Sequence, residues 1–317
     1  MATKFCITGV TVSIKTGVAT LLFSAIFFAC KKQAVDTAPP QVMPAGPVTV
    51  MLRNPLPAVL HESSGVCYTD GNCWTFGDSG NLNGIYKIDT TTGAVKQIVI
   101  VQNFSNTDWE DITADSLYIY VGDFGNNDGN RKDLKVIRIK KTDLDNSSSQ
   151  LSINADAINF SYADQTDFNT NTNTNFDCEA LVSIDTSLYI FTKDGGDLKT
   201  RCYRLPKDTG TYPVLPISTF DTQGKITSAA YNPVTKELAL GGYMNKKVFP
   251  FIWFFKKFTD NNFFEGSKVR EALTTTGTPW QTEGIDYVSP DRMFITCEST
   301  SQVAASLFVI KLNLAYP

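Results

Sequence analysis

Pairs of acidic residues recur along this sequence at positions where their carboxylates could bind a metal ion. In each pair the first acid stands just before or at the start of a predicted strand, and the second follows about 13 to 16 positions later, where the next strand ends. Carboxylate oxygens are preferred ligands of Ca²⁺, which takes roughly six to eight oxygens in loose geometry. Without a cation, carboxylates held close together repel one another. The pairs are Glu62 with Asp78, Glu110 with Asp123, Glu179 with Asp194, and Glu283 with Glu298.

Two of the loops that carry these acids are nearly identical. Residues 77–84 read Gly-Asp-Ser-Gly-Asn-Leu-Asn-Gly, and residues 122–129 read Gly-Asp-Phe-Gly-Asn-Asn-Asp-Gly. Each loop offers oxygen side chains between glycines, which permit tight turns. The alternative is that these side chains only bond to their own backbone, as Asp and Asn commonly do in turns. The residues therefore leave open whether the carboxylates bind a metal or are purely structural.

The acidic pairs belong to a longer repeat of short β-strands. In the first copy an Asp70-Gly71 hairpin signal separates two strands, and two more strands follow. Four-stranded units at a long period are typical of a β-propeller rather than a β-sandwich. The predicted strands are 65–68, 73–76, 85–88 and 96–101; 112–114, 117–121, 134–139 and 157–162; 180–184, 188–191, 201–205 and 214–220; 226–231, 237–240, 249–255 and 269–274; and 284–288, 293–296 and 307–312.

The two ends of the repeat predict how the ring closes. The fifth copy lacks its outer strand, and residues 48–53 form a strand without a partner. Joining the two leaves no open sheet edge there. We therefore predict an all-β fold in which residues 48–317 form a single β-propeller with four-stranded antiparallel blades. We count five blades, and six remains an alternative because the loops between copies differ in length.

A propeller would bring the acids together. The first strand of each blade is the innermost, and a hairpin places the start of its first strand beside the end of its second. The acids should therefore meet at one mouth of a central channel, although blade four has Thr227-Ser228 and Gly241-Gly242-Tyr243 in their place. We predict a Ca²⁺ site at this mouth, with ligands among Glu62, Asp78, Glu110, Asp123, Glu179 and Glu283.

Three other residues near this mouth are candidates for chemistry. His61, the only histidine, is a candidate general base, although a lone histidine is often a structural hydrogen-bonding group. Because the sequence has a single histidine, zinc sites built from two or three histidines are excluded. Arg131 and Lys193 could hold an anionic ligand or neutralise the carboxylates. The sequence has no GxSxG nucleophile motif.

The first residues predict export and lipidation. Lys4 and Lys15 accompany an apolar stretch, residues 17–29, that is short for a membrane span, and Cys30 follows it. This arrangement resembles a bacterial lipoprotein signal, in which residues 1–29 are removed and Cys30 is lipidated. An ordinary secretory signal or an N-terminal anchor is the alternative. Residues 30–47 are rich in proline and predict a flexible tether. We expect a lipid-anchored protein of the bacterial cell envelope, at the outer membrane.

The composition limits which partners the protein can bind and which reactions its cysteines can undergo. The formal net charge is −4 and basic residues occur only in short groups, which argues against a nucleic-acid surface. Of seven cysteines, five remain once Cys6 and Cys30 are set aside, and no CxxC zinc pattern occurs. Cys67 and Cys73 flank the predicted hairpin turn and could form a disulfide, although a two-residue turn puts them one place out of register.

The motifs resemble a known group of proteins. ESSG, WTFGDSGN, DWEDI, GDFGNN and DCEAL are similar to segments of bacterial propellers related to the SdiA-regulated and phytase-like esterase families, over roughly residues 59–205. The resemblance implies a propeller with a Ca²⁺ site like that of gluconolactonase-type propellers, in which an axial glutamate binds the metal. Carried over to this sequence, the metal-binding role of the axial glutamate would belong to Glu62, Glu110, Glu179 and Glu283. Blade four has no acidic residue at the corresponding position.

Two functional hypotheses follow. The first is a membrane-anchored propeller that binds a small molecule or an envelope protein, because the fold hosts many functions and no catalytic triad is visible. The second is a metal-dependent hydrolase of esters, lactones or phosphate esters, in which the cation polarises the scissile group and activates water. In that case Glu110 or Glu179 would bind the metal, and His61 or another carboxylate would be the base.

Overall fold

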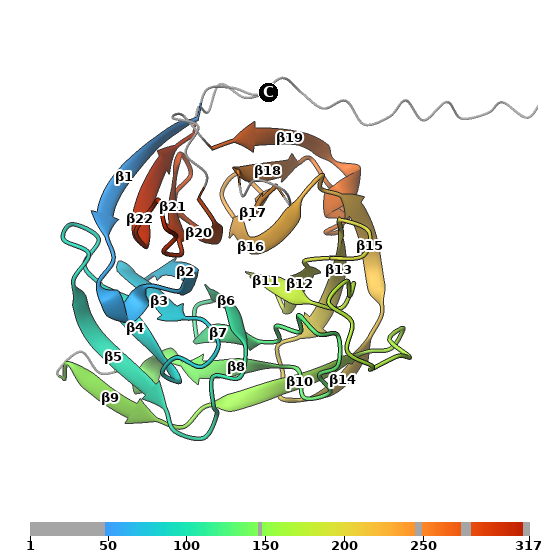
Figure 1. The fold of residues 1–317 in the computed structure, drawn as a ribbon, viewed down its shortest axis with the longest axis horizontal. Coiled ribbons are helices and arrows are strands. Elements are labelled where there is room, and N and C mark those ends of the chain that lie inside the picture. The colour runs from blue at the N-terminus through green and yellow to red at the C-terminus, as the bar shows by residue number, and fades with distance from the viewer. Residues whose placement is uncertain (1–47, 145–147, 245–248, 274–279, 313–317) are drawn as a thin grey trace, which may run out of the picture. The chain divides into compact units, whose positions relative to one another are not determined.

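Five β-sheets are arranged as blades around a central axis (Figure 1). The computed structural model describes residues 48–144, 148–244, 249–273 and 280–312. Their arrangement confirms the predicted all-β fold and the count of five blades in a β-propeller. The predicted signal peptide, the tether and Cys30 lie outside the described residues.

In blades one to four the first strand is innermost, and the strands that follow it outward are in chain order. Blade one contains β2 (Ser63–Thr69), β3 (Asn72–Gly77), β4 (Gly84–Ile88) and β5 (Val95–Val101). Blade two contains β6 (Trp109–Ala114), β7 (Tyr118–Asp123), β8 (Lys135–Lys140) and β10 (Asp156–Tyr162). Blade three contains β11 (Cys178–Ile184), β12 (Ser187–Thr192), β13 (Lys199–Pro206) and β15 (Pro216–Asp221). Blade four contains β16 (Lys225–Asn232), β17 (Glu237–Tyr243), β18 (Pro250–Lys256) and β19 (Ser267–Ala272).

The fifth blade joins the two ends of the described chain. It contains β20 (Thr282–Ser289), β21 (Arg292–Cys297), β22 (Ser306–Lys311) and, as its outer strand, β1 (Thr49–Pro55). Strand β1 pairs antiparallel with β22, and its register shifts between Leu52 and Asn54. The predicted closure of the ring by the N-terminal strand is therefore confirmed.

Two further strands extend the outer edges of blades one and two. β9 (Gln150–Ile153) pairs parallel with β5, and β14 (Gly210–Val214) pairs parallel with β10. The prediction of one strand over residues 214–220 is wrong, because the chain ends one strand at Val214 and begins another at Pro216. Pro213 and Pro216 lack amide protons, and edge strands such as β14 and β15 tolerate proline because one side of the strand is unpaired.

Short 3-10 turns are the helical elements of the described residues. They are η1 (Ala58–Leu60), η2 (Lys141–Asp143) and η3 (Phe263–Glu265). In this part of the chain, no helix has the length and apolar character needed to cross a membrane.

Apolar side chains fill the spaces between neighbouring blades. Strand β18 shows why: Phe251, Trp253 and Phe255 pack against blade three, whereas Ile252 and Phe254 pack against blade five. Both faces of a middle strand are thus buried, and each large side chain contributes roughly 1.5–3 kcal/mol. The aromatic run therefore serves packing between blades.

The hairpin of blade one settles the disulfide question. Asp70 and Gly71 both have positive φ angles, 51° and 74°, as a two-residue turn requires. Tyr68 is paired with Cys73, and Cys67 with Trp74, so the two cysteines lie on opposite faces of the sheet. Both are buried free thiols. The candidate disulfide between Cys67 and Cys73 is not formed.

A buried carboxylate joins the innermost strands of three blades. Asp111 of β6 accepts hydrogen bonds from the backbone amides of Leu181 in blade three (2.8 Å) and Ala229 in blade four (3.2 Å). Its side chain is fully buried. Asp111 therefore satisfies amides that face the axis and have no partner in their own sheets.

Two side chains make the equivalent links around the rest of the ring. Ser228 Oγ in blade four accepts a hydrogen bond from the Ile285 amide of blade five (2.8 Å). Asp286 in blade five accepts one from the Tyr68 amide of blade one (2.6 Å). Polar contacts thus join blade two to blades three and four, blade four to blade five, and blade five to blade one.

Candidate metal centre at the mouth of the ring

A β-bulge interrupts the innermost strand of every blade at the position of the acidic motif. In blade two, Trp109 pairs with Asp123 and Asp111 with Gly122, so Glu110 has no partner. The same shift leaves one extra residue at the corresponding place in every other blade. A bulge of this kind re-aims the extra side chain. The bulged residues are Ser64, Glu110, Glu179, Thr227 and Glu283.

Two further positions are equivalent in all blades. The residue two before the bulged one is Glu62, Asp108, Asp177, Lys225 or Gln281. The second position is the residue that follows the partner of the residue just before the bulge, and it is Asp78, Phe124, Lys193, Tyr243 or Glu298. These two positions are joined by backbone hydrogen bonds, such as Asp78 N to Glu62 O and Phe124 N to Asp108 O. We call the end of the ring formed by these three sets of residues the mouth.

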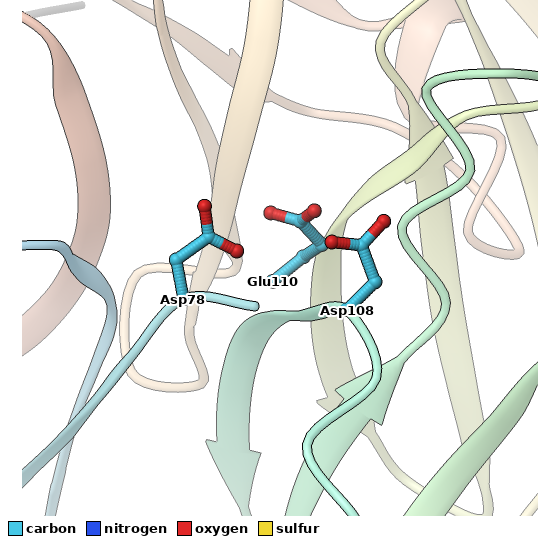
Figure 2. Close-up of side chains that lie close together, drawn as sticks. All are labelled: Asp78, Asp108 and Glu110. Atoms are coloured by element: carbon cyan, nitrogen blue, oxygen red, sulfur yellow. The ribbon is translucent and has the colours of Figure 1, made fainter. Parts of the chain in front are cut away.

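Three carboxylates converge between blades one and two. Asp78 follows β3, whereas Asp108 precedes β6 and Glu110 occupies its bulge. One carboxylate oxygen from each lies within 4.8 Å of the other two. Figure 2 shows the three carboxyl groups turned toward one another. Glu110 is only 6% exposed, so this group is a built part of the ring rather than a chance surface cluster.

A glycine makes room for two of these side chains. A Cβ atom on Gly125 would overlap with Glu110 Oε1 and with the Asp108 carboxylate. The Gly125 amide also donates a hydrogen bond to the Asp108 carbonyl (3.1 Å). The Gly-Asp-Phe-Gly loop therefore permits a close approach of backbone to carboxylates, which a larger residue would prevent.

Few hydrogen-bond donors reach the carboxylates of Asp78, Asp108 and Glu110. Within the described ranges, no hydrogen bond or ion pair reaches the side chains of Asp108 and Glu110, and Asp78 accepts one from the Ser79 amide. Burial and the charge of Asp78 raise the pKa of Asp108 to about 6. Burial, followed by the charge of Glu179, raises the pKa of Glu110 well above its usual range. A cation would offset both effects, and oxygen ligands without histidine or thiolate fit a hard ion such as Ca²⁺.

Blade three contributes an internal counter-charge. Lys193 forms ion pairs with Glu179 and with Asp177, the latter at 3.5 Å. Burial raises the pKa of Glu179 to about 8, although the Lys193 charge opposes this shift. The predicted metal ligand Glu179 is therefore paired with the Lys193 ammonium group. Of the two roles considered for Lys193, holding an anionic ligand and neutralising carboxylates, these ion pairs correspond to the second.

Asp123 lies apart from the three converging carboxylates. It is the equivalent of Gly77 rather than of Asp78, although both aspartates stand in a Gly-Asp sequence. A shift of one residue turns a strand side chain to the opposite face. Asp123 accordingly forms ion pairs with Arg131 (2.9 Å) and Lys135 (3.1 Å). Arg131 is thus engaged with a carboxylate rather than open to an anion.

Glu62 and His61 lie at the rim of the mouth. Asn81 donates a hydrogen bond to Glu62 (2.8 Å), and His61 Nε2 is 3.5 Å from the same carboxylate. The His61 Nδ1 atom lies 3.0 Å from the Ala58 carbonyl, and its side chain is 54% exposed. Glu283, the remaining predicted ligand, occupies the bulge of β20 in blade five, which packs beside β2 of blade one.

Asp108 is the member of the group that sequence reasoning did not select. A signal for it exists: Asp108-Trp-Glu110 and Asp177-Cys-Glu179 repeat one pattern, with an acid two places before the bulged glutamate. Its meaning depends on the bulge, which the strand pattern alone does not reveal.

Comparisons with known proteins leave the function open. No protein-family model matches the sequence, and no curated protein matches it. Among solved structures, a protein of unknown function from Dyadobacter fermentans aligns with a TM-score of 0.45 and 9% identity, covering 78% of this chain and 76% of that one.

Two other solved structures align more loosely. Hydrazine synthase from Kuenenia stuttgartiensis has a TM-score of 0.37 and 11% identity over 74% of this chain. This chain spans 55% of the hydrazine synthase chain. YCF48 from Cyanidioschyzon merolae has a TM-score of 0.37 and 9% identity, covering 82% and 85% of the two chains. Such weak likenesses say nothing about the ligand.

Proposed function

We propose that this protein is a ligand-binding propeller whose mouth holds a Ca²⁺ ion between blades one and two. The observation that carries the proposal is the convergence of Asp78, Asp108 and Glu110, two of them without a hydrogen-bond donor among the described residues. The resemblance to propellers with an axial glutamate supports the same ion. A cation at this place would leave open coordination positions for oxygen atoms of a ligand.

Calcium titration of the protein and its Glu110→Gln variant tests this proposal. The wild type should bind Ca²⁺ by isothermal titration calorimetry and melt at a higher temperature with Ca²⁺ than with EDTA, because an ion that binds only the folded state stabilises it. Glu110→Gln should weaken binding about tenfold or more, since it removes one charged ligand. Glu265→Gln, an exposed carboxylate on η3, is the matched control. An equal melting temperature with Ca²⁺ and EDTA would contradict the proposal.

We further propose that the protein acts at the bacterial cell envelope, anchored through a lipid on Cys30. The support is the apolar segment before Cys30 and the proline-rich residues after it. Acyl chains hold a protein at a membrane because each buried CH₂ contributes roughly 0.8 kcal/mol. Cys30→Ala should move the protein from the membrane fraction to the soluble fraction, and retention in the membrane fraction would oppose lipidation.

A metal-dependent hydrolase is the second candidate. The observation that favours it is Glu179, whose pKa of about 8 would suit acid–base chemistry near neutral pH. A bound cation would supply polarisation of an ester, lactone or phosphate ester. A substrate panel assayed on wild type and Glu110→Gln decides: activity that disappears with Glu110→Gln favours the hydrolase, and equal activity in both proteins removes Glu110 from the chemistry.

A further inference from the structure

A second group of carboxylates faces the mouth from blade five. Glu283 occupies the bulge of β20, and Glu298 follows β21 at the position equivalent to Asp78. Gln281 donates a hydrogen bond to Glu298 (3.0 Å), which fixes that carboxylate beside its neighbour. Burial and the charges of Asp78 and Glu62 raise the pKa of Glu298 to about 7, so this group adjoins the three carboxylates between blades one and two.

The Glu283 carboxylate is buried, and not all of its oxygens have a hydrogen-bond partner. The Glu283 side chain is 5% exposed, and its Oε1 atom is buried with no hydrogen-bond partner. A buried polar atom without a partner is costly, so such an atom in a folded protein calls for an explanation. Burial and the nearby charge of Glu298 raise the pKa of Glu283 well above its usual range. The missing partner of this oxygen is therefore a hydrogen-bond donor, and a positively charged donor would also offset the repulsion between Glu283 and Glu298.

The protein does not supply that partner from its described residues. Lys193 is engaged with Glu179 and Asp177 in blade three. Neither Glu283 nor Glu298 takes part in an ion pair within residues 48–144, 148–244, 249–273 and 280–312. Burial raises the pKa of the Tyr243 hydroxyl in blade four, and the charges of Glu283, Glu179 and Glu298 add to this shift. Tyr243 occupies the position in blade four that Glu298 occupies in blade five.

We infer that the Glu283–Glu298 side of the mouth binds an organic cation, a primary ammonium or guanidinium group of the ligand whose remaining oxygens approach the Ca²⁺ ion. The inference rests on the proposed ligand-binding function and names the chemistry of the ligand. Two carboxylates can accept hydrogen bonds from one ammonium or guanidinium group, and such charge-assisted bonds are roughly twice as strong as neutral ones.

A second metal ion is less suited to this place. The described residues contain a single group of three convergent acidic ligands, formed by Asp78, Asp108 and Glu110. Glu283 and Glu298 offer two carboxylates, whereas a divalent metal held mainly by protein oxygens takes more. A donor-rich organic cation needs only these two.

Calorimetric titration with cadaverine, and with 1,5-pentanediol as its neutral analogue, tests the inference. The full chain is titrated at 0.15 M salt with excess Ca²⁺ and again with EDTA. Cadaverine should bind the wild type and the diol should not. Glu283→Gln and Glu298→Gln should each weaken cadaverine binding about tenfold or more, while Glu265→Gln should leave it unchanged. Thermal melts show that each variant is folded, and Glu298→Gln serves if Glu283→Gln does not fold.

The same titrations separate this inference from the calcium proposal. Calcium binding by Glu283→Gln with lost cadaverine binding supports both. Cadaverine binding without any Ca²⁺ binding overturns only the metal, and Ca²⁺ binding without cadaverine binding overturns only the organic cation. A second equivalent of Ca²⁺ that disappears in Glu283→Gln would also overturn the inference, because the site would then be a metal site.

Discussion

At the residue scale, the chemistry of the mouth depends on which side chain occupies each equivalent position. The bulged position carries Glu110, Glu179 and Glu283 in three blades, but Ser64 and Thr227 in the other two. Thr227 donates a hydrogen bond to the Thr282 carbonyl of blade five (2.6 Å) and so joins blades instead of facing a ligand. The mouth is therefore lopsided, with a metal group on one side and the Glu283–Glu298 pair on another.

Gly125→Ala should weaken Ca²⁺ binding although it removes no ligand. The added Cβ would overlap with Glu110 and Asp108, so both carboxylates would have to move. We expect a loss of affinity of about tenfold, or roughly 1.4 kcal/mol, by calorimetry. Gly195→Ala in blade three is the control, because its Cβ would meet atoms no closer than 3.3 Å. Unchanged affinity in Gly125→Ala would place the ion elsewhere.

At the element scale, local patterns were sufficient for most strands. Apolar runs bounded by turn signals predicted nearly every blade strand, because strand formation depends on alternation and on turns such as Asp70-Gly71. Strands β9 and β14 were missed, since they form only by pairing with the edges of other blades. The bulges were missed for a related reason: a bulge is a property of two paired strands, not of one.

The contacts between innermost strands predict a pH dependence. Burial raises the pKa of Asp286 to about 7, although the amides of Tyr68 and Tyr287 oppose this shift. The folded state then binds more protons than the unfolded state between about pH 4 and pH 7, so this residue makes stability fall as pH rises through that window. Asp286→Asn should be less sensitive to pH than the wild type.

Urea denaturation in EDTA at pH 5 and pH 8 measures this effect. The difference in unfolding free energy between the two pH values should be smaller in Asp286→Asn than in the wild type, since the other buried acids titrate in both proteins. An identical difference in both would show that Asp286 is ionised throughout.

At the scale of the whole molecule, the ring depends on a strand from the start of the described chain. Strand β1 covers β22, and Val48 and Val50 pack against the core between blades four and five. Without β1, the backbone groups of β22 would form an exposed edge, which favours pairing with other chains.

Truncation tests this closure. A chain that begins at residue 56 should be less stable than one that begins at residue 48, by roughly 3 kcal/mol for the lost apolar burial, and should aggregate. Thermal melting and size-exclusion chromatography measure both effects, and the chain that begins at residue 48 is the control. Equal stability of the two chains would show that the ring does not need β1.

The sequence by itself determined most blade strands, a count of five blades with six as the alternative, and the closing strand, because these follow from local alternation, turn residues and an N-terminal strand that could complete the last copy. It also indicated that acids gather at one mouth. Only the tertiary structure decided which acids meet there. Asp78 and Asp123 share a Gly-Asp sequence, yet their strands differ by one residue in register, so one faces the mouth and the other turns toward Arg131 and Lys135. Register is set by pairing between strands, and one residue of shift reverses the direction of a side chain.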